Sequence, residues 1–186
     1  MKVFKTLTLS MILGALGILH LSWAKRVISF TSVTCSGSNK SMMILECSVK
    51  PVAEEQNGLN IVMDFFKKIE SFVLTYNFSI KIRKGFRSLV NGDKLDVCKF
   101  LNGTKTKSNV MNYVMDMVKH TFPERSLRPC PIIGRHDLVN ITAGRPGSTA
   151  TVFPESSYRV TMKYSSKEDD NIISILLYVV AKDIKD

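Results

Sequence analysis

Residues 71–83 alternate apolar and polar side chains, and this stretch limits the possible folds more than any other part of the sequence. Because successive side chains of a β-strand point to opposite faces of a sheet, a period of two predicts a long strand with one buried face. A strand of about 13 residues is roughly twice the usual length and suits a curved sheet. The apolar positions are Phe72, Leu74, Tyr76, Phe78, Ile80 and Ile82.

Shorter alternating or apolar stretches predict further strands, so that the chain is mainly β. Regular turns between them favour an antiparallel two-sheet β-sandwich or cup with one helical insertion. The first two strands are expected to form a hairpin around residues 37–39, and residues 91–93 are expected to form a turn. These further strands cover residues 27–35, 43–49, 59–65, 95–101, 136–142, 158–164 and 172–181. The continuous apolar run of the last one predicts a central or covered strand.

The four cysteines of the chain are Cys35, Cys47, Cys98 and Cys130. An even number in a secreted chain indicates two disulfides, although four cysteines permit three pairings and the sequence does not select among them. We favour Cys35–Cys47 and Cys98–Cys130, because each pair flanks a local excursion of the chain. The sequence has no C-x-x-C motif, which argues against a metal site.

Residues 109–119 predict one helix between Cys98 and Cys130. Ser108 is a suitable N-cap, and Pro123 stops the helix. Polar side chains form only a narrow stripe, so the helix is apolar over more than half of its circumference. It is therefore either a core helix that plugs the side of a sheet or the wall of an apolar cavity. Apolar helix faces more often belong to cores.

Residues 1–24 are expected to form a secretory signal peptide. A basic start with Lys2 and Lys5 precedes a long apolar run that ends in small residues. An uncleaved signal anchor is the alternative, because the run is nearly long enough to span a membrane. The mature chain, residues 25–186, is then a single domain of a secreted, extracellular protein.

Four N-x-S/T sequons support passage through the secretory pathway and predict glycosylated surface positions. They begin at Asn39, Asn77, Asn102 and Asn140. The formal net charge of +10 falls to +8 once Lys2 and Lys5 leave with the signal peptide. Apart from the basic run at residues 81–84, the cations are scattered, and no pattern predicts binding to nucleic acid.

The sequence contains no recognisable catalytic motif, and we expect neither an enzyme nor a cofactor. His120, beside a predicted helix end, is interpreted as a capping residue. His136 and Asp137 are interpreted as a solvated pair at the start of a strand. Asp169 and Asp170 lack the spaced partners that a calcium site requires.

Several short motifs carry a resemblance to a known family. The most specific are the Asp-x-Cys-x-Phe-Leu run around Cys98 and the Cys-Pro-x-x-Gly run that begins at Cys130. The Cys35–Cys47 spacing and the Phe-Pro segment before Tyr158 extend the likeness over essentially all of the mature chain. The chain resembles an insect secreted family, large in flies, that includes the CheB chemosensory proteins. That family is similar to the ganglioside-activator and ML lipid-recognition proteins.

This resemblance implies a β-cup whose two sheets splay apart to admit a small hydrophobic ligand, such as a lipid or a cuticular hydrocarbon. It also implies a role in chemosensation or pheromone response, with a membrane receptor as a further candidate partner. The alternative is a secreted protein-interaction module whose inward side chains only pack a closed core. The candidate lining residues are Phe72, Leu74, Tyr76, Phe78 and Ile80 from the long strand and Met111, Met115 and Val118 from the helix.

Overall fold

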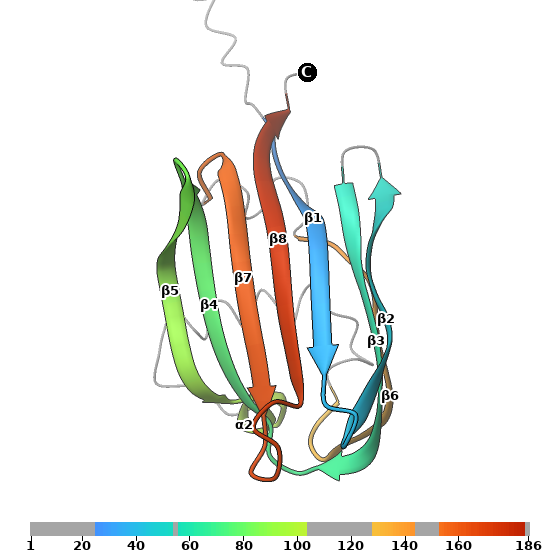
Figure 1. Ribbon diagram of the computed structural model, residues 1–186. Coiled ribbons are helices and arrows are strands. Elements are labelled where there is room, and N and C mark those ends of the chain that lie inside the picture. The colour runs from blue at the N-terminus through green and yellow to red at the C-terminus, as the bar shows by residue number, and fades with distance from the viewer. Residues whose placement is uncertain (1–24, 54–55, 104–127, 144–152, 185–186) are drawn as a thin grey trace, which may run out of the picture.

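The computed structural model describes residues 25–53, 56–103, 128–143 and 153–184, which form two β-sheets and one short helix (Figure 1). One sheet has five strands in the order β1-β8-β7-β4-β5, and the other has three in the order β2-β3-β6. The elements are β1 (Lys25–Gly37), β2 (Met42–Ala53), β3 (Gln56–Ile69), β4 (Val73–Ile82), β5 (Gly85–Asp96), α2 (Val97–Leu101), β6 (Ile132–Ile141), β7 (Ser156–Ser165) and β8 (Ile173–Ile184).

All neighbouring strands in both sheets pair antiparallel, which confirms the predicted mainly-β, two-sheet architecture. Figure 1 shows the five strands side by side, with the three-stranded sheet at their β1 side and seen nearly edge-on. The signal peptide expected at residues 1–24 and the helix expected at residues 109–119 lie outside the described residues.

Strand β8 forms the centre of the core, because β1 and β7 pair with its two edges. Its continuous apolar run predicted such a covered position, and the structure confirms it. On the facing sheet, β3 contributes five buried side chains to the core cluster, those of Leu59, Ile61, Met63, Phe65 and Ile69. The inward side chains of β8 are between 0% and 8% exposed, and they are Ile173, Ile175, Leu177, Val179 and Ala181.

The predicted hairpin between the first two strands is wrong. β1 pairs with β8, whereas β2 pairs with β3 in the other sheet. The turn between them carries the chain from one sheet to the other, and the Ser38 N–H donates to the Ile172 carbonyl at 2.9 Å. Alternation along one strand identifies the face that it buries but not the strand with which it pairs, so the local pattern left this partner undetermined.

The predicted turn at residues 91–93 and the predicted strand at residues 95–101 are also wrong. β5 continues to Asp96, and the chain then forms α2. The Asp96 carboxylate caps this helix by accepting a hydrogen bond from the Lys99 N–H at 3.0 Å. Gly92 lies inside the strand, where the missing side chain leaves room for the ring of Tyr76 on β4.

Both disulfides connect one sheet to the other, with the pairing favoured from the sequence. Cys35 on β1 is bonded to Cys47 on β2, with their Cα atoms 6.1 Å apart. Cys98 in α2 is bonded to Cys130, which lies just before β6, with a Cα separation of 5.4 Å. β1 and β5 are the edge strands of one sheet, and β2 and β6 are the edge strands of the other. One disulfide therefore joins β1 to β2 directly, and the other joins the helix that follows β5 to the segment that precedes β6.

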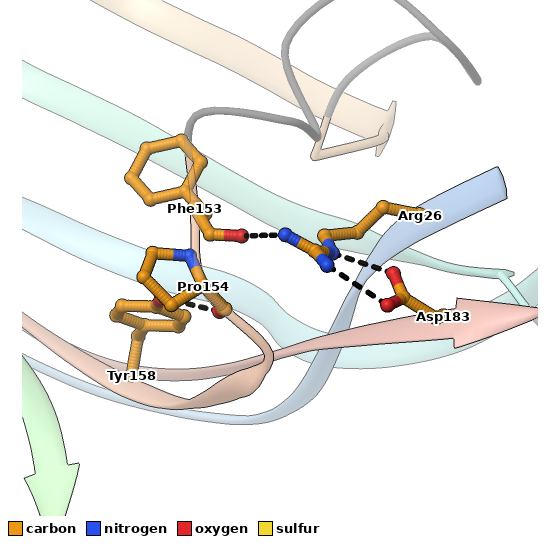
Figure 2. A network of polar contacts seen from close by, with 5 residues as sticks. All are labelled: Arg26, Phe153, Pro154, Tyr158 and Asp183. Carbon is orange, nitrogen blue, oxygen red and sulfur yellow. Dashed lines mark hydrogen bonds and ion pairs between the residues drawn. The ribbon is translucent and has the colours of Figure 1, made fainter. Parts of the chain in front are cut away.

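Arg26 joins β1 and β8 to the segment before β7 (Figure 2). Its Nε and Nη2 atoms donate to the Asp183 carboxylate at 2.6 and 2.8 Å, and its Nη1 atom donates to the Phe153 carbonyl at 2.8 Å. The Tyr158 hydroxyl donates to the Pro154 carbonyl at 2.6 Å. These bonds hold the segment before β7 against the end of the core.

His136 lies on the inward face of β6, so its interpretation as part of a solvated pair is wrong. Its ring meets that of Phe65 edge-on, with a centroid distance of 5.5 Å. Asp137 instead accepts a hydrogen bond from Arg135 Nε at 2.8 Å. Desolvation lowers the pKa of His136, and a backbone hydrogen bond with Ile133 opposes this effect only in part.

This lowered pKa predicts a loss of stability at mildly acidic pH. An unfolded histidine binds its proton near pH 6.5, whereas folded His136 binds it at a lower pH, so acid favours the unfolded state. The free energy of unfolding should decrease as the pH falls below about 6.5. Urea unfolding between pH 7.5 and 5.5 measures this slope. The variant His136→Gln should show a shallower slope than the parent protein, and equal slopes would contradict the assignment.

Candidate ligand-binding face

The inward face of the five-stranded sheet changes from buried to partly exposed between β8 and β5. One cross-strand row runs from Leu177 on β8 through Val160 on β7 and Phe78 on β4 to Val90 on β5. Leu177 is 6% exposed, Val160 and Phe78 are partly buried, and Val90 is 39% exposed. The inward face is therefore most open on its β5 side.

The position of the three-stranded sheet explains this gradient. Among the contacts between the two sheets, those of β1 with β2 and β3 are the most extensive. Figure 1 shows the three-stranded sheet at the β1 side, away from β4 and β5. Side chains that point inward from β4 and β5 consequently have less of the opposite sheet to pack against.

Three of the five predicted lining residues of the long strand have partners in the core. The Phe72 ring is buried and stacks on Tyr164, with ring centroids 4.9 Å apart. The Phe78 ring stacks on Tyr158 at 5.3 Å. Ile80 packs against the same core cluster.

Tyr76 belongs to a second, smaller apolar cluster. It packs with Leu95 and Leu101 around Phe100, which is buried in α2. Its ring also lies across Gly92, its cross-strand partner on β5, so closely that a Cβ atom at Gly92 would collide with the ring. The tyrosine therefore joins β4, β5 and α2 at one end of the inward face.

Leu74, Ile82 and Val90 are inward apolar residues that belong to neither apolar cluster, and Ile82 lies at the hairpin end of β4. Leu74 is partly buried but belongs to neither apolar cluster. Val90 was not predicted as a lining residue. Two register shifts between β4 and β5 interrupt the alternation of β5, so the sequence pattern did not reveal which of its side chains point inward.

Tyr164 adds one polar group to this apolar face, and the sequence analysis also missed its role. It lies beside Leu74 in the ladder between β7 and β4. Among the described residues its hydroxyl contacts a weak acceptor, the Sδ atom of Met162 at 3.8 Å. Desolvation raises the pKa of Tyr164 to about 12, so the hydroxyl remains a neutral donor at physiological pH.

A pocket of about 210 Å³ borders the Cys98–Cys130 disulfide, but its chemistry differs from that of the inward face. Lys68 and Glu70, which form an ion pair at 3.0 Å, line it together with Asn102 and Pro131. Pockets for small molecules usually exceed about 300 Å³ and are mostly apolar. The small volume and the charged lining of this pocket are therefore unlike those of a site for an apolar molecule.

The four predicted glycosylation sites differ in their surroundings. Asn39 and Asn102 are exposed, the latter at the C-terminal cap of α2. Asn140 is exposed on β6, with a φ angle of 56°. Asn77 is partly buried on the outward face of β4, where its amide donates to Ser88 Oγ at 2.8 Å.

The remaining predicted lining residues, Met111, Met115 and Val118, lie outside the described residues. Within the described ranges, no group of three or more His, Cys, Asp or Glu side chains is placed to hold a metal ion. No helix in this part of the chain is long and apolar enough to cross a membrane.

Comparisons with known proteins identify a distant structural likeness. No protein-family model and no curated protein matches the sequence. One similar solved structure is that of a Niemann-Pick type C2 protein from the Japanese carpenter ant. It is 10% identical, and the match covers 84% of this chain and 94% of that chain with a TM-score of 0.31. This superposition is too loose to support an inference about function.

The contact between Tyr76 and Gly92 predicts a position-specific response to an added methyl group. The variant Gly92→Ala should lower the free energy of unfolding by about 1–3 kcal/mol, because the new Cβ atom displaces the Tyr76 ring. Gly85→Ala is the matched control, since its added Cβ atom meets open space. Chemical denaturation measures both variants. Equal stability of the two would show that the ring does not require glycine at this position.

Proposed function

We propose that this protein is a secreted binder of small hydrophobic ligands, held on the β4–β5 part of the inward face. The observation that carries the proposal is the row from Leu177 to Val90, in which exposure rises from 6% to 39% while every side chain remains apolar. A closed sandwich core would bury the whole row. An apolar ligand fits a surface that points inward and is incompletely covered.

Desolvation of an alkyl chain would supply most of the binding free energy. Each buried CH₂ group contributes about 0.8 kcal/mol, so a chain of several carbons gains enough to bind even after the cost of immobilisation. Leu74 and Val90 are the proposed first contacts, because they belong to neither apolar cluster. The predicted lining residues Met111, Met115 and Val118 are proposed to complete the apolar wall.

The Tyr164 hydroxyl is the proposed contact for a polar end group. It lies beside Leu74 and is a neutral donor whose only described acceptor is the thioether of Met162. A ligand oxygen would be a stronger acceptor than this sulfur. The favoured ligand is therefore an alkyl chain that carries a hydroxyl, carbonyl or carboxyl oxygen.

Secretion and a chemosensory role belong to the same proposal. Two disulfides fit an oxidising compartment, and the signal peptide and the four sequons point to the secretory pathway. The resemblance to the insect family of CheB proteins suggests that the ligand is a chemical signal presented to a membrane receptor. We further propose glycans on Asn39, Asn102 and Asn140, whose residues are exposed.

A protein-interaction module is the second candidate function, and the outward face of the three-stranded sheet favours it. Three large apolar side chains there are more than half exposed, and each follows a buried neighbour on its strand. An exposed apolar patch of this kind is typical of a protein-binding surface. The exposed residues are Met43 at 51%, Phe66 at 54% and Ile133 at 55%.

A pair of matched valine substitutions tests the ligand-binding proposal. Val90→Glu places a carboxylate on the inward face, and its desolvation should weaken the binding of a fluorescent fatty acid by about tenfold or more. Val139→Glu is the control, because Val139 is similarly exposed, 36% against 39%, but lies on the outward face of β6. Fluorescence titration of both variants gives the two values of Kd.

Equal affinity of the two valine variants would contradict binding on the β4–β5 face. If neither variant nor the parent protein takes up fatty acids, fatty alcohols or hydrocarbons, the second candidate function is favoured. Denaturant unfolding of each variant checks that the charge has not simply destabilised the fold.

The substitution Tyr164→Phe tests the proposed polar contact separately. Loss of one hydrogen bond should weaken the binding of a fatty acid or fatty alcohol by roughly tenfold. Binding of a hydrocarbon of equal chain length should be unchanged, because it has no oxygen to accept the bond. An equal loss for both ligands would show that Tyr164 contributes only packing.

A further inference from the structure

The hairpin that joins β4 to β5 carries an unusual density of positive charge. Lys81 ends the outward face of β4, and Arg83 and Lys84 form the turn. All three residues are exposed, and we refer to them as the hairpin cations. Arg87, also exposed, lies on β5 opposite Ile80. The sequence contains no acidic residue between Glu70 and Asp93, so the hairpin itself provides no compensating charge.

None of the hairpin cations forms an ion pair with the described residues. The five ion pairs of the described chain involve other cations, namely Arg26, Lys50, Lys68, Lys99 and Arg135. Glu155, at the start of β7, is the acid that the fold brings to this end of the sheet, and its charge adds to the larger effect of Asp183 in raising the pKa of Arg26. The positive charge of the hairpin is consequently available to a partner.

Arg159 extends this positive charge along the outward face. Its guanidinium lies over the ring of Phe86 on β5, with the Cζ atom 4.8 Å from the ring centroid. The Phe86 ring also contacts the Tyr178 ring on β8 at a centroid distance of 5.9 Å. The Nε atom of Arg159 is buried and has no hydrogen-bond partner among the described residues. The aromatic rings therefore fix the position of a guanidinium that forms no ion pair with a carboxylate of the described residues.

Arg159 and Lys81 lie on the outward face, and Arg83 and Lys84 continue from Lys81 in the turn, so the four cations form a row that ends at the hairpin. Arg159 lies beside Ser79 in the ladder between β7 and β4, and Lys81 and Arg83 follow Ser79 at steps of two residues. With a rise of about 3.3 Å per strand residue, the row is roughly 13 Å long. Its neighbours on the outward face are the rings of Phe86 and Tyr178 and the hydroxyl or amide side chains of Asn77, Ser88, Ser157 and Thr161, whereas Ser79 is buried.

We propose that this row binds a sulfated polysaccharide. A linear polyanion carries several charges at intervals and can contact several cations of the row at once. Guanidinium groups bind oxyanions through paired N–H donors, and the surrounding hydroxyl and amide groups suit a sugar backbone. A secreted protein with such a row would be retained at cell surfaces or in extracellular matrix.

The placement of the apolar residues favours a polysaccharide over a lipid bilayer. A membrane-binding hairpin needs exposed apolar and cationic groups that face the same surface. Here Ile82 and Val90 point to the inward face, opposite to Lys81 and Arg159. The apolar rings on the outward face, those of Phe86 and Tyr178, are partly buried, and Arg159 lies over that of Phe86. The exposed Leu89 lies in the register shift between β4 and β5 and is not part of the row. This inference is independent of the ligand-binding proposal, which concerns the inward face.

A pair of charge-matched triple variants tests the row. Lys81→Thr, Arg83→Asn and Lys84→Ser together remove the hairpin cations, and asparagine suits the φ angle of 50° at position 83. The control combines Lys50→Thr, Lys67→Asn and Lys68→Ser, three exposed lysines of the other sheet. Both variants lose the same net charge. The full secreted chain is titrated with heparin at about 0.15 M salt, near physiological ionic strength.

The parent protein should bind heparin more tightly than it binds hyaluronan, which carries carboxylates but no sulfate. The hairpin variant should bind heparin about tenfold to hundredfold more weakly, and the control variant should remain close to the parent. Equal weakening of both variants would overturn the proposal, because net charge alone would then explain binding. Binding to vesicles of phosphatidylserine and phosphatidylcholine but not to heparin would overturn it in favour of a membrane surface.

Three further experiments complete the test. If the hairpin variant does not fold, the double variant Arg83→Asn and Lys84→Ser, confined to the exposed turn, replaces it and should weaken heparin binding in the same direction. The hairpin variant should take up fatty acid as the parent protein does, because the hairpin cations are not part of the proposed ligand-binding face. Heparin binding and fatty-acid uptake therefore test the two proposals separately. Enzymatic removal of N-glycans establishes whether a glycan on Asn77, which lies on the same face, limits access to the row.

Discussion

Covalent cross-links between the two sheets are the constraint on which the rest of the structure depends. Cys35–Cys47 joins β1 to β2, and Cys98–Cys130 joins the helix after β5 to the segment before β6. By loop-closure entropy, cross-links that span 12 and 32 residues stabilise the fold by about 3 and about 4 kcal/mol. The buried core is concentrated around β8. The free energy contributed by the disulfides offsets the apolar burial that is lost where the inward side of β4 and β5 is incompletely covered.

The two faces of β4 and β5 serve different chemistry because side chains alternate along a strand. The inward face of β4 and β5 is mainly apolar, with Val90 and Ile82 exposed, Leu74 partly buried and the Tyr164 hydroxyl as a neutral donor. The outward face is polar and cationic, and the Phe86 ring fixes the Arg159 guanidinium there. A ligand on one face and a polyanion on the other would not compete for the same side chains, so uptake of a ligand and retention at a surface would be compatible in one small domain.

The features that the sequence predicted are those that depend on local periodicity. The alternation of residues 71–83 predicted a strand with one inward apolar face, and the continuous apolar run at residues 172–181 predicted a covered strand. Features that depend on distant partners were missed. Gly92 was predicted to lie in a turn, but it lies within β5, where the absence of a side chain leaves room for the Tyr76 ring of the neighbouring strand. Val90 was not among the predicted lining residues, because register shifts interrupt the alternation of β5. Tyr164 was not among them either, because the desolvation that raises its pKa depends on the folded structure.

Photochemical labelling with an alkyl diazirine fatty acid would test the central claim most directly, since it records where an apolar ligand lies on the folded protein. The labelled protein is digested under reducing conditions, and the modified peptides are identified by mass spectrometry. Our account predicts adducts on β4, β5 and β7, around Leu74, Val90 and Tyr164, that an excess of unlabelled fatty acid suppresses. Adducts concentrated at Met43, Phe66 and Ile133 on the outward face of the other sheet, or labelling that competitor does not reduce, would contradict it.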